Sequence, residues 1–218
     1  MFFLAPKPRV AGPAKTKTFI STLTISGSVN PATYSSYNFG SAAAGTLIIV
    51  AAEASGASGV TLTGITIGGN AMTLIVGAAV SQHRSAIYAY RVPAGATLTT
   101  ANIVVTYSGS VPRNSIAVWK VTNVDNITPT ATATSTADPA TATLPVADGG
   151  VAFGFAGVSD TGSATWSGLT EDSDVNYDSA NGHSSGGSAA TTGDGSLSIS
   201  CDRTSADARR TAVFASFA

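Results

Sequence analysis

The sequence contains few charged residues. Only 11% of its 218 residues are Asp, Glu, Lys or Arg, whereas about 25% is typical of a soluble domain. A folded surface made mostly of Ser, Thr, Asn, Gly and small apolar groups has little electrostatic protection against self-association. This composition favours a protein that works within an assembly, where most of its surface is covered.

The sequence has a single cysteine, Cys201, which excludes an internal disulfide. In the segment around it, Leu197, Ile199 and Cys201 alternate with serines, so the three share one face of a predicted strand. We therefore expect a buried and inert thiol. The fold must be held together by its core alone.

Long apolar runs are also missing. No stretch of about 18 apolar residues occurs, which excludes a membrane-spanning helix. At the start of the chain, Phe2, Phe3 and Leu4 precede the first charge, Lys7, and Pro6 interrupts them. A secretory signal has the opposite order, with a basic start before a longer apolar core. We expect no membrane partner and no signal peptide.

Residues that could act in catalysis or bind a metal ion, a phosphate or a nucleic acid are scarce. The two histidines, His83 and His183, have no Cys, His or carboxylate at metal-ligand spacing, and we expect both in solvated turns. No Gly-x-Ser-x-Gly motif occurs at a strand-to-helix turn, and the glycine-rich segments connect strands to strands. Only four lysines occur, three of them before residue 18, which argues against a nucleic-acid surface. We therefore predict that the protein is not an enzyme and has no cofactor other than a candidate calcium ion.

Period-two alternation of apolar and polar residues dominates after residue 17. It is clearest at 19–26, and 45–52 is a continuous apolar run typical of a central strand. Glycines and an asparagine at 68–70 predict a hairpin turn. Further strands are predicted at 85–92, 102–107, 115–124, 140–146, 150–158, 163–169, 196–201 and 210–217. We predict an all-β fold, a single antiparallel β-sandwich or jelly roll over residues 18–218.

Two polar stretches interrupt this pattern. Residues 128–143 are built from Thr, Ala, Ser and Pro, and we interpret them as a crossing connection with edge-strand character. Residues 178–195 are rich in Ser, Gly and Thr and predict a long loop. The apolar final residues, 213–218, predict a strand buried inside a sheet, which favours one closed domain.

Residues 1–17 have a different composition. Three prolines separate basic residues and leave no strand or helix pattern, so this segment predicts an extended arm that becomes ordered only against a partner. A flexible tail is the alternative. The candidate partner-binding residues of the arm are Lys7, Arg9, Lys15 and Lys17.

An acidic cluster is the best candidate for a ligand site. Its carboxylates could bind calcium or act as an acid and base pair, and nearby aromatic rings could stack on a sugar. The cluster lacks the glycine and glutamate spacing of an EF-hand, and a solvated acidic loop with packed aromatics is the alternative. The candidate glycan or calcium loop comprises Trp166, Glu171, Asp172, Asp174, Tyr177 and Asp178.

Charge is uneven along the chain although the net charge is -1. Up to Val124, eight basic residues against the single acid Glu53 give +7, and from Asp125 onward eleven acids against three arginines give -8. If the two halves present separate surfaces, opposite charges would guide contacts between copies in a homo-oligomer. In the alternative, strands from both halves interleave in one sandwich and the charges mix.

Several strand and turn motifs carry a family resemblance. They are VTLTGITIGGNAMT (60–73), IYAYRVPAG (87–95), IVVTYSG (103–109), AVWKV (117–121) and WSGLTED (166–172). Together they resemble a set of tailed-bacteriophage and prophage virion proteins. The resemblance implies a β-sandwich component of the phage particle, such as a head decoration, head-fibre or tail-associated protein. It implies localisation in the virion and major capsid or tail proteins as partners, and it carries over no catalytic residue.

Two functions follow as hypotheses. In the first, the protein is a structural component of a phage virion whose arm docks on neighbouring subunits. In the second, it is a carbohydrate-binding or adhesive module that recognises a host-surface glycan, with Trp166, Tyr177 and the adjoining acids as its site and calcium as a candidate ligand.

Overall fold

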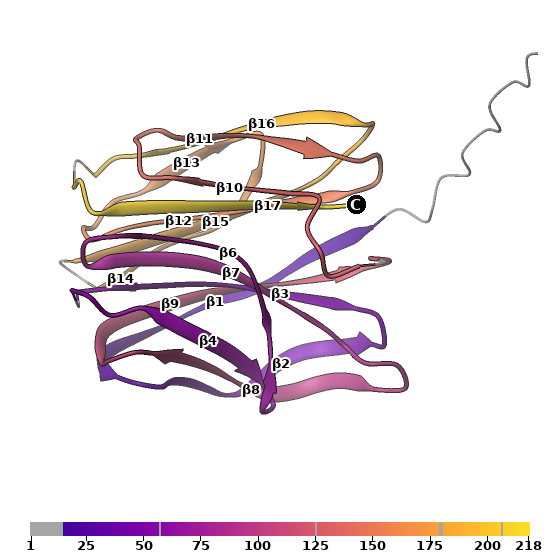
Figure 1. Ribbon diagram of the computed structural model, residues 1–218, viewed down its shortest axis with the longest axis horizontal. Coiled ribbons are helices and arrows are strands. Elements are labelled where there is room, and N and C mark those ends of the chain that lie inside the picture. Colours follow the sequence, from indigo (N-terminus) through magenta and orange to yellow (C-terminus); the bar gives the residue numbers. More distant parts are fainter. Residues whose placement is uncertain (1–14, 57, 125, 179–180, 206) are drawn as a thin grey trace, which may run out of the picture.

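The computed structural model describes residues 15–56, 58–124, 126–178, 181–205 and 207–218. These residues form four antiparallel sheets stacked in layers (Figure 1). The all-β antiparallel fold is confirmed, and the sandwich is doubled: residues 16–122 build two of the sheets and residues 131–217 build the other two. We call these pairs the N-terminal and the C-terminal sandwich.

The N-terminal sandwich consists of an inner sheet with the strand order β1-β9-β3-β7-β6 and an outer sheet with the order β2-β8-β4-β5. Its strands are β1 (Thr16–Val29), β2 (Ala32–Ala43), β3 (Leu47–Ser55), β4 (Leu62–Ile67), β5 (Asn70–Ala71), β6 (Thr73–Val80), β7 (His83–Arg91), β8 (Thr97–Tyr107) and β9 (Val111–Thr122).

The C-terminal sandwich has an inner sheet with the order β10-β17-β12-β15-β14 and an outer sheet with the order β11-β16-β13. Its strands are β10 (Ala131–Ser135), β11 (Ala140–Val146), β12 (Val151–Val158), β13 (Ala164–Ser167), β14 (Thr170–Asp178), β15 (Gly182–Ala190), β16 (Gly195–Arg203) and β17 (Arg210–Phe217).

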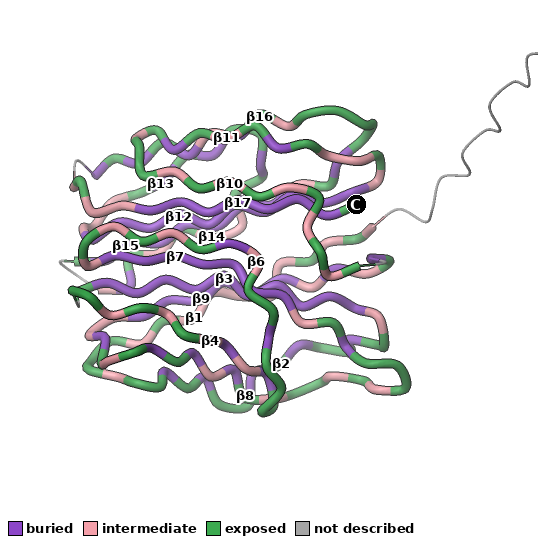
Figure 2. The backbone as a smooth tube through the Cα atoms, viewed as in Figure 1, coloured by how far each residue is buried: buried purple, intermediate pink, exposed green. Residues whose placement is uncertain are grey.

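Three hydrophobic clusters hold the four layers together. One lies inside each sandwich, and a third lies between the two inner sheets. The central strands of the inner sheets are therefore covered on both faces, and all nine residues of β3 and all eight of β12 are buried. Figure 2 shows the same contrast, with buried backbone in the inner layers and exposed backbone in the outer ones.

The two sandwiches are internal repeats of one topology. Strand for strand, β1-β9-β3-β7-β6 corresponds to β10-β17-β12-β15-β14, and β2-β8-β4 corresponds to β11-β16-β13. The registers agree too: β3 pairs Leu47 with Val121 on β9, and β12 pairs Val151 with Phe217 on β17. Sequence analysis did not find this repeat.

The inner sheets face each other with an approximate twofold relation. Ser85 on β7 lies 2.6 Å from Thr211 on β17, and the equivalent hydroxyls, Ser184 on β15 and Ser115 on β9, lie 2.8 Å apart. Such reciprocal contacts are typical of an isologous dimer interface. Here both halves of the interface belong to one chain.

Three sequence expectations need correction. Residues 178–195, predicted as a long loop, contain the buried strand β15. Residues 128–143 contain β10 and the beginning of β11, which are edge strands of two different sheets, so their edge-strand character is confirmed while the crossing connection between the two strands is short. The interleaving of both halves in one sandwich is also wrong, since each sheet takes its strands from one half of the chain. Among the described residues, the basic and the acidic halves of the sequence therefore belong to different sandwiches.

Candidate functional site

A buried polar cluster lies between the two inner sheets, at the end where β3 and β12 finish. Glu53 on β3 is fully buried and accepts a hydrogen bond from the hydroxyl of Tyr177 on β14. The same hydroxyl lies 3.2 Å from the hydroxyl of Ser55. One carboxylate, one phenol and one serine thus join the N-terminal sandwich to the C-terminal one.

Gly157 makes room for this carboxylate. A Cβ atom at Gly157 on β12 would lie 1.5 Å from Oε2 of Glu53. Gly157 is the residue equivalent to Glu53 in the second sandwich, because Glu53 pairs with Ser115 on β9 and Gly157 pairs with Thr211 on β17, the strand equivalent to β9. The position that Glu53 takes therefore requires a glycine at 157.

A serine, a histidine and the same glutamate form a chain of polar atoms in this cluster. Nδ1 of His83 lies 3.3 Å from the hydroxyl of Ser159, and Nε2 of His83 lies 3.5 Å from Oε1 of Glu53. These residue types occur in hydrolytic triads. However, His83 is fully buried and Ser159 is only 5% exposed, so a substrate has almost no access.

The charge state of His83 also disfavours catalysis. Burial, together with the positive charges of Arg203 and Arg84, lowers the pKa of His83 to about 3. A general base works best when its pKa lies near the working pH. The chain of Ser159, His83 and Glu53 is therefore better explained as part of the interface than as a catalytic set.

The predicted acidic loop is a strand. Residues 170–178 form β14, an edge strand of the inner sheet. Asp172 accepts a hydrogen bond from the indole nitrogen of Trp119 at 2.8 Å and another from the hydroxyl of Ser188. Because Trp119 belongs to the other sandwich, this carboxylate also joins the two repeats.

The remaining acids of the strand differ in their environment. Asp174 pairs with His183, and Asp178 pairs with Arg113 of the N-terminal sandwich. Glu171 is exposed to solvent. Among the described residues, no group of three or more His, Cys, Asp and Glu side chains could hold a metal ion.

The two aromatic residues proposed for glycan stacking are buried. Trp166 is 9% exposed, and its indole nitrogen donates a hydrogen bond to Ser185 at 2.7 Å. Tyr177 is 6% exposed, and its hydroxyl is bound to Glu53. Their ring faces are used for packing inside the molecule, which leaves the glycan hypothesis without its aromatic platform.

The expectation of solvated histidines is wrong. His83 is 0% exposed and His183 is 1% exposed. His83 is the first residue of β7 and His183 is the second residue of β15, both strands of inner sheets. Cys201 is buried as expected, and burial raises the pKa of its thiol to about 12.

Only the last part of the predicted arm is described. Lys7 and Arg9 lie outside the described residues. Lys15 donates its backbone N–H to the carbonyl of Gly149 at 3.3 Å, and Lys17 is already part of β1, where it pairs with Val121. Residues 1–14 of the predicted arm lie outside the described residues, and Thr16 begins β1, an edge strand of an inner sheet.

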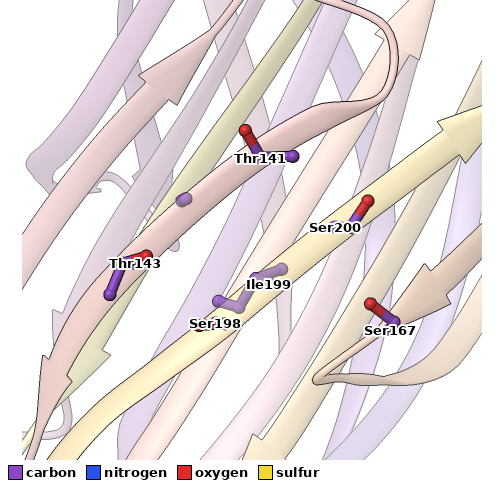
Figure 3. Close-up of a pocket in the computed structure, with 7 residues that line it drawn as sticks. Thr141, Thr143, Ser167, Ser198, Ile199 and Ser200 are labelled. Atoms are coloured by element: carbon purple, nitrogen blue, oxygen red, sulfur yellow. The ribbon is translucent and has the colours of Figure 1, made fainter.

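The outer sheet of the C-terminal sandwich presents a shallow depression of about 440 Å³, lined by both hydroxyl and apolar side chains. Figure 3 shows hydroxyl side chains of β11 beside those of β16 and β13. Hydroxyls of this kind can take part in contacts with another surface, but they include no titratable group and no aromatic ring. The residues around the depression are Thr141, Ala142, Thr143, Ser167, Ser198, Ile199 and Ser200.

Within the described residues, no helix is long and apolar enough to cross a membrane. No family model matches the sequence, and neither a curated protein nor a solved structure matches it. The resemblance to phage virion proteins therefore stays a prediction, and the function has to be argued from the molecule itself.

Proposed function

We propose that the protein is a structural component of a bacteriophage virion that acts through protein–protein contacts. One observation carries this proposal: the described side chains that could take part in catalysis or ligand binding mostly form contacts between the two sandwiches. Glu53, His83 and Tyr177 are buried in that interface, and Asp172 and Asp178 bind residues of the opposite sandwich. The remaining outer surfaces of such a molecule are suited to protein–protein contacts.

Composition and charge support the same function. The outer faces carry mostly hydroxyls and small side chains, and charged residues make up only 11% of the sequence. The basic and acidic halves of the chain are separate sandwiches. A body that is basic at one end and acidic at the other favours ordered contact between copies or with neighbouring subunits.

The test is the composition of phage particles. Particles released by a host that carries this gene are purified on a density gradient and analysed by mass spectrometry and by immunogold labelling with an antibody against the protein. We expect the full-length chain to band with the particles at a fixed ratio to the major capsid or tail protein. Its absence from intact particles would overturn the proposal.

A truncated chain tests the role of the arm. Removing residues 1–14 leaves all of β1 in place, so we expect the circular dichroism spectrum and the melting temperature to stay unchanged. We expect incorporation into particles to fall at least tenfold. A chain in which residues 1–14 are replaced by a Gly/Ser segment of equal length is the matched control, and it should behave like the truncation if the arm sequence matters.

A further inference from the structure

An asparagine followed by a glycine stands at the beginning of β15. Asn181 is exposed in the turn before this strand, and Gly182 is the first residue of the strand. None of the other asparagines of the sequence precedes a glycine. Asparagine is among the chemically labile residues of proteins, and a glycine after it leaves the next backbone nitrogen unhindered because glycine has no Cβ. The sequence therefore favours deamidation at this dipeptide over the other asparagines.

Hydrogen bonds hold the side chains of most other asparagines. Those with such bonds are Asn30, Asn38, Asn70, Asn102, Asn114, Asn126 and Asn176. In the exposed turns, for example, the amide nitrogen of Asn70 donates to the carbonyl of Ile67, and the side-chain oxygen of Asn126 accepts from the N–H of Thr128. Within the part of the chain that the structure describes, the side chain of Asn181 forms no hydrogen bond. It can therefore rotate toward the nitrogen of the next residue.

The backbone of this dipeptide lies against the polar cluster between the sandwiches. The hydroxyl of Ser55 donates to the carbonyl of Asn181 at 3.4 Å. A Cβ atom at Gly182 would lie 2.3 Å from a ring carbon of Tyr177, whose hydroxyl is bound to Glu53. A change in the length or path of the backbone here therefore displaces groups that join the two sandwiches.

We propose that Asn181 is a site of spontaneous deamidation and that the isoaspartate formed there weakens the contact between the sandwiches. The backbone nitrogen of Gly182 attacks Cγ of Asn181 and loses its proton, while the C–N bond of the side-chain amide breaks and ammonia leaves. Water then opens the resulting succinimide ring. Attack of water at Cγ gives aspartate, and attack at the backbone carbonyl carbon gives isoaspartate. The net reaction consumes one water molecule and releases one ammonia, with no change of oxidation state.

The isoaspartate product alters the contact in two ways. Its main chain runs through the former side chain, so one methylene group is added between residues 181 and 182 and Gly182 is displaced from Tyr177. The carbonyl that accepts the hydrogen bond from Ser55 becomes part of a carboxylate, which adds a negative charge close to Asp178, the residue paired with Gly182. Like charges at short distance repel each other. This inference does not depend on the proposed function.

Peptide mapping by mass spectrometry of the full-length chain tests the reaction. The purified protein is incubated at mildly alkaline pH, once folded and once in denaturant, and fragment ions distinguish isoaspartate from aspartate. In the folded protein we expect Asn181 to react at least tenfold faster than Asn70 and Asn126, which are also exposed. Equal rates at the three positions in the folded protein would overturn the proposal, and so would a reaction of Asn181 that occurs only in denaturant.

The effect on the interface is measured on the same incubated samples. We expect the melting temperature to fall by at least about 2 °C once most chains carry isoaspartate. Asn181→Gln is the control, because glutamine forms the corresponding larger ring far more slowly, and its melting temperature should stay constant during the incubation. Freshly purified Asn181→Asp adds the charge without the extra methylene group, so it should lose less than the isoaspartate form. An unchanged melting temperature in a sample with isoaspartate at position 181 would overturn the claim that the product weakens the interface.

Discussion

Glu53 and Gly157 occupy the same position in the two repeats, and they face each other across the approximate twofold relation between the sandwiches. A second glycine of the C-terminal sandwich makes room for a large side chain of the N-terminal one, at positions that are not equivalent in the two repeats. A Cβ atom at Gly186 on β15 would lie 2.9 Å from the indole ring of Trp119 on β9. At these two places the N-terminal sandwich contributes the large side chain, and the C-terminal sandwich contributes the space for it.

This difference explains why the N-terminal sandwich pairs with the C-terminal sandwich and not with another copy of itself, although the two share one topology. Two copies of the N-terminal sandwich would place two glutamates at one buried position, which costs free energy because buried like charges repel and lose their hydration. Two copies of the C-terminal sandwich would leave gaps where Glu53 and Trp119 stand. Complementary divergence of the repeats therefore favours the pairing within the chain over pairing between identical halves.

The largest predicted effect comes from breaking this complementarity. Gly157→Ala would force Glu53 to move although the carboxylate is fully buried and bound to Tyr177. We expect the free energy of unfolding to fall by at least about 3 kcal/mol. Chemical denaturation of the purified chain measures it. Gly64→Ala is the control, since a Cβ there meets no atom within 4 Å.

A second substitution tests whether the loss of stability in Gly157→Ala comes from the contact between the new methyl group and Glu53. In the Gly157→Ala background, Glu53→Ala removes the side chain that the new methyl group meets. We expect this pair of substitutions to be coupled by more than about 1 kcal/mol in a double-mutant cycle. A cost for Gly157→Ala no larger than that for Gly64→Ala would contradict the packing described for the interface.

The strand β15 shows why part of the fold was not predicted. Its sequence, GHSSGGSAA, is typical of a loop because glycine and serine have low strand propensity. In the structure, Gly186 and Gly187 are needed for close approach of the rings of Trp119 and Trp166. The cause is a contact between segments about 20 to 70 residues apart, which local periodicity does not report. Strands with strong alternation or continuous apolar runs, such as 45–52, were predicted well.

Only part of the candidate site was predicted from the sequence. The acids of residues 171–178 were recognised as a cluster, but not the partners that engage them, which come from β9 and β15. Glu53 was counted only as a charge. Its place directly after the continuous apolar run 45–52 was the available signal that it is buried, because a strand covered on both faces leaves no exposed side for a carboxylate.

A medium effect is expected from the acid that crosses the interface. Asp172→Ala removes the acceptor for the indole nitrogen of Trp119 and leaves that buried donor without its partner. The free energy of unfolding should fall by about 1–3 kcal/mol. The adjacent exposed acid supplies the control, since Glu171→Ala should change stability by less than about 0.5 kcal/mol.

Calcium provides a further measurement on the same two variants. The described carboxylates of β14 are engaged by other side chains or exposed singly, so millimolar calcium should not raise the melting temperature of the unaltered chain. A rise that disappears with Glu171→Ala would revive the calcium site and with it the alternative adhesive function.

The smallest effect is the contribution of Glu53 to the dependence of stability on pH. Burial raises the pKa of Glu53 well above its ordinary value of 4.5, against the opposing effects of the Tyr177 hydrogen bond and the charge of Arg203. The folded protein therefore keeps a proton on Glu53 where the unfolded chain has lost it, and stability falls as pH rises through that range. For His83, whose pKa is lowered from 6.5 to about 3, the sign is opposite, and stability rises between those values.

The two contributions oppose each other from about pH 4.5 to 6.5, and above pH 6.5 that of His83 is complete. Comparison with Glu53→Gln isolates the glutamate, because the buried thiol of Cys201, whose pKa is raised from 9.0 to about 12, adds a decline of the same sign above about pH 8. We expect the free energy of unfolding to decline as pH rises above 4.5 for as long as folded Glu53 holds the extra proton, and Glu53→Gln, which has no proton to lose, to remove that part of the decline. A stability of the unaltered chain that depends on pH no more than that of Glu53→Gln would mean that Glu53 is ionised in the interface. In that case the glycine opposite it accommodates a buried charge, and the pairing of the two sandwiches depends on the neighbouring arginines instead of on a neutral carboxyl group.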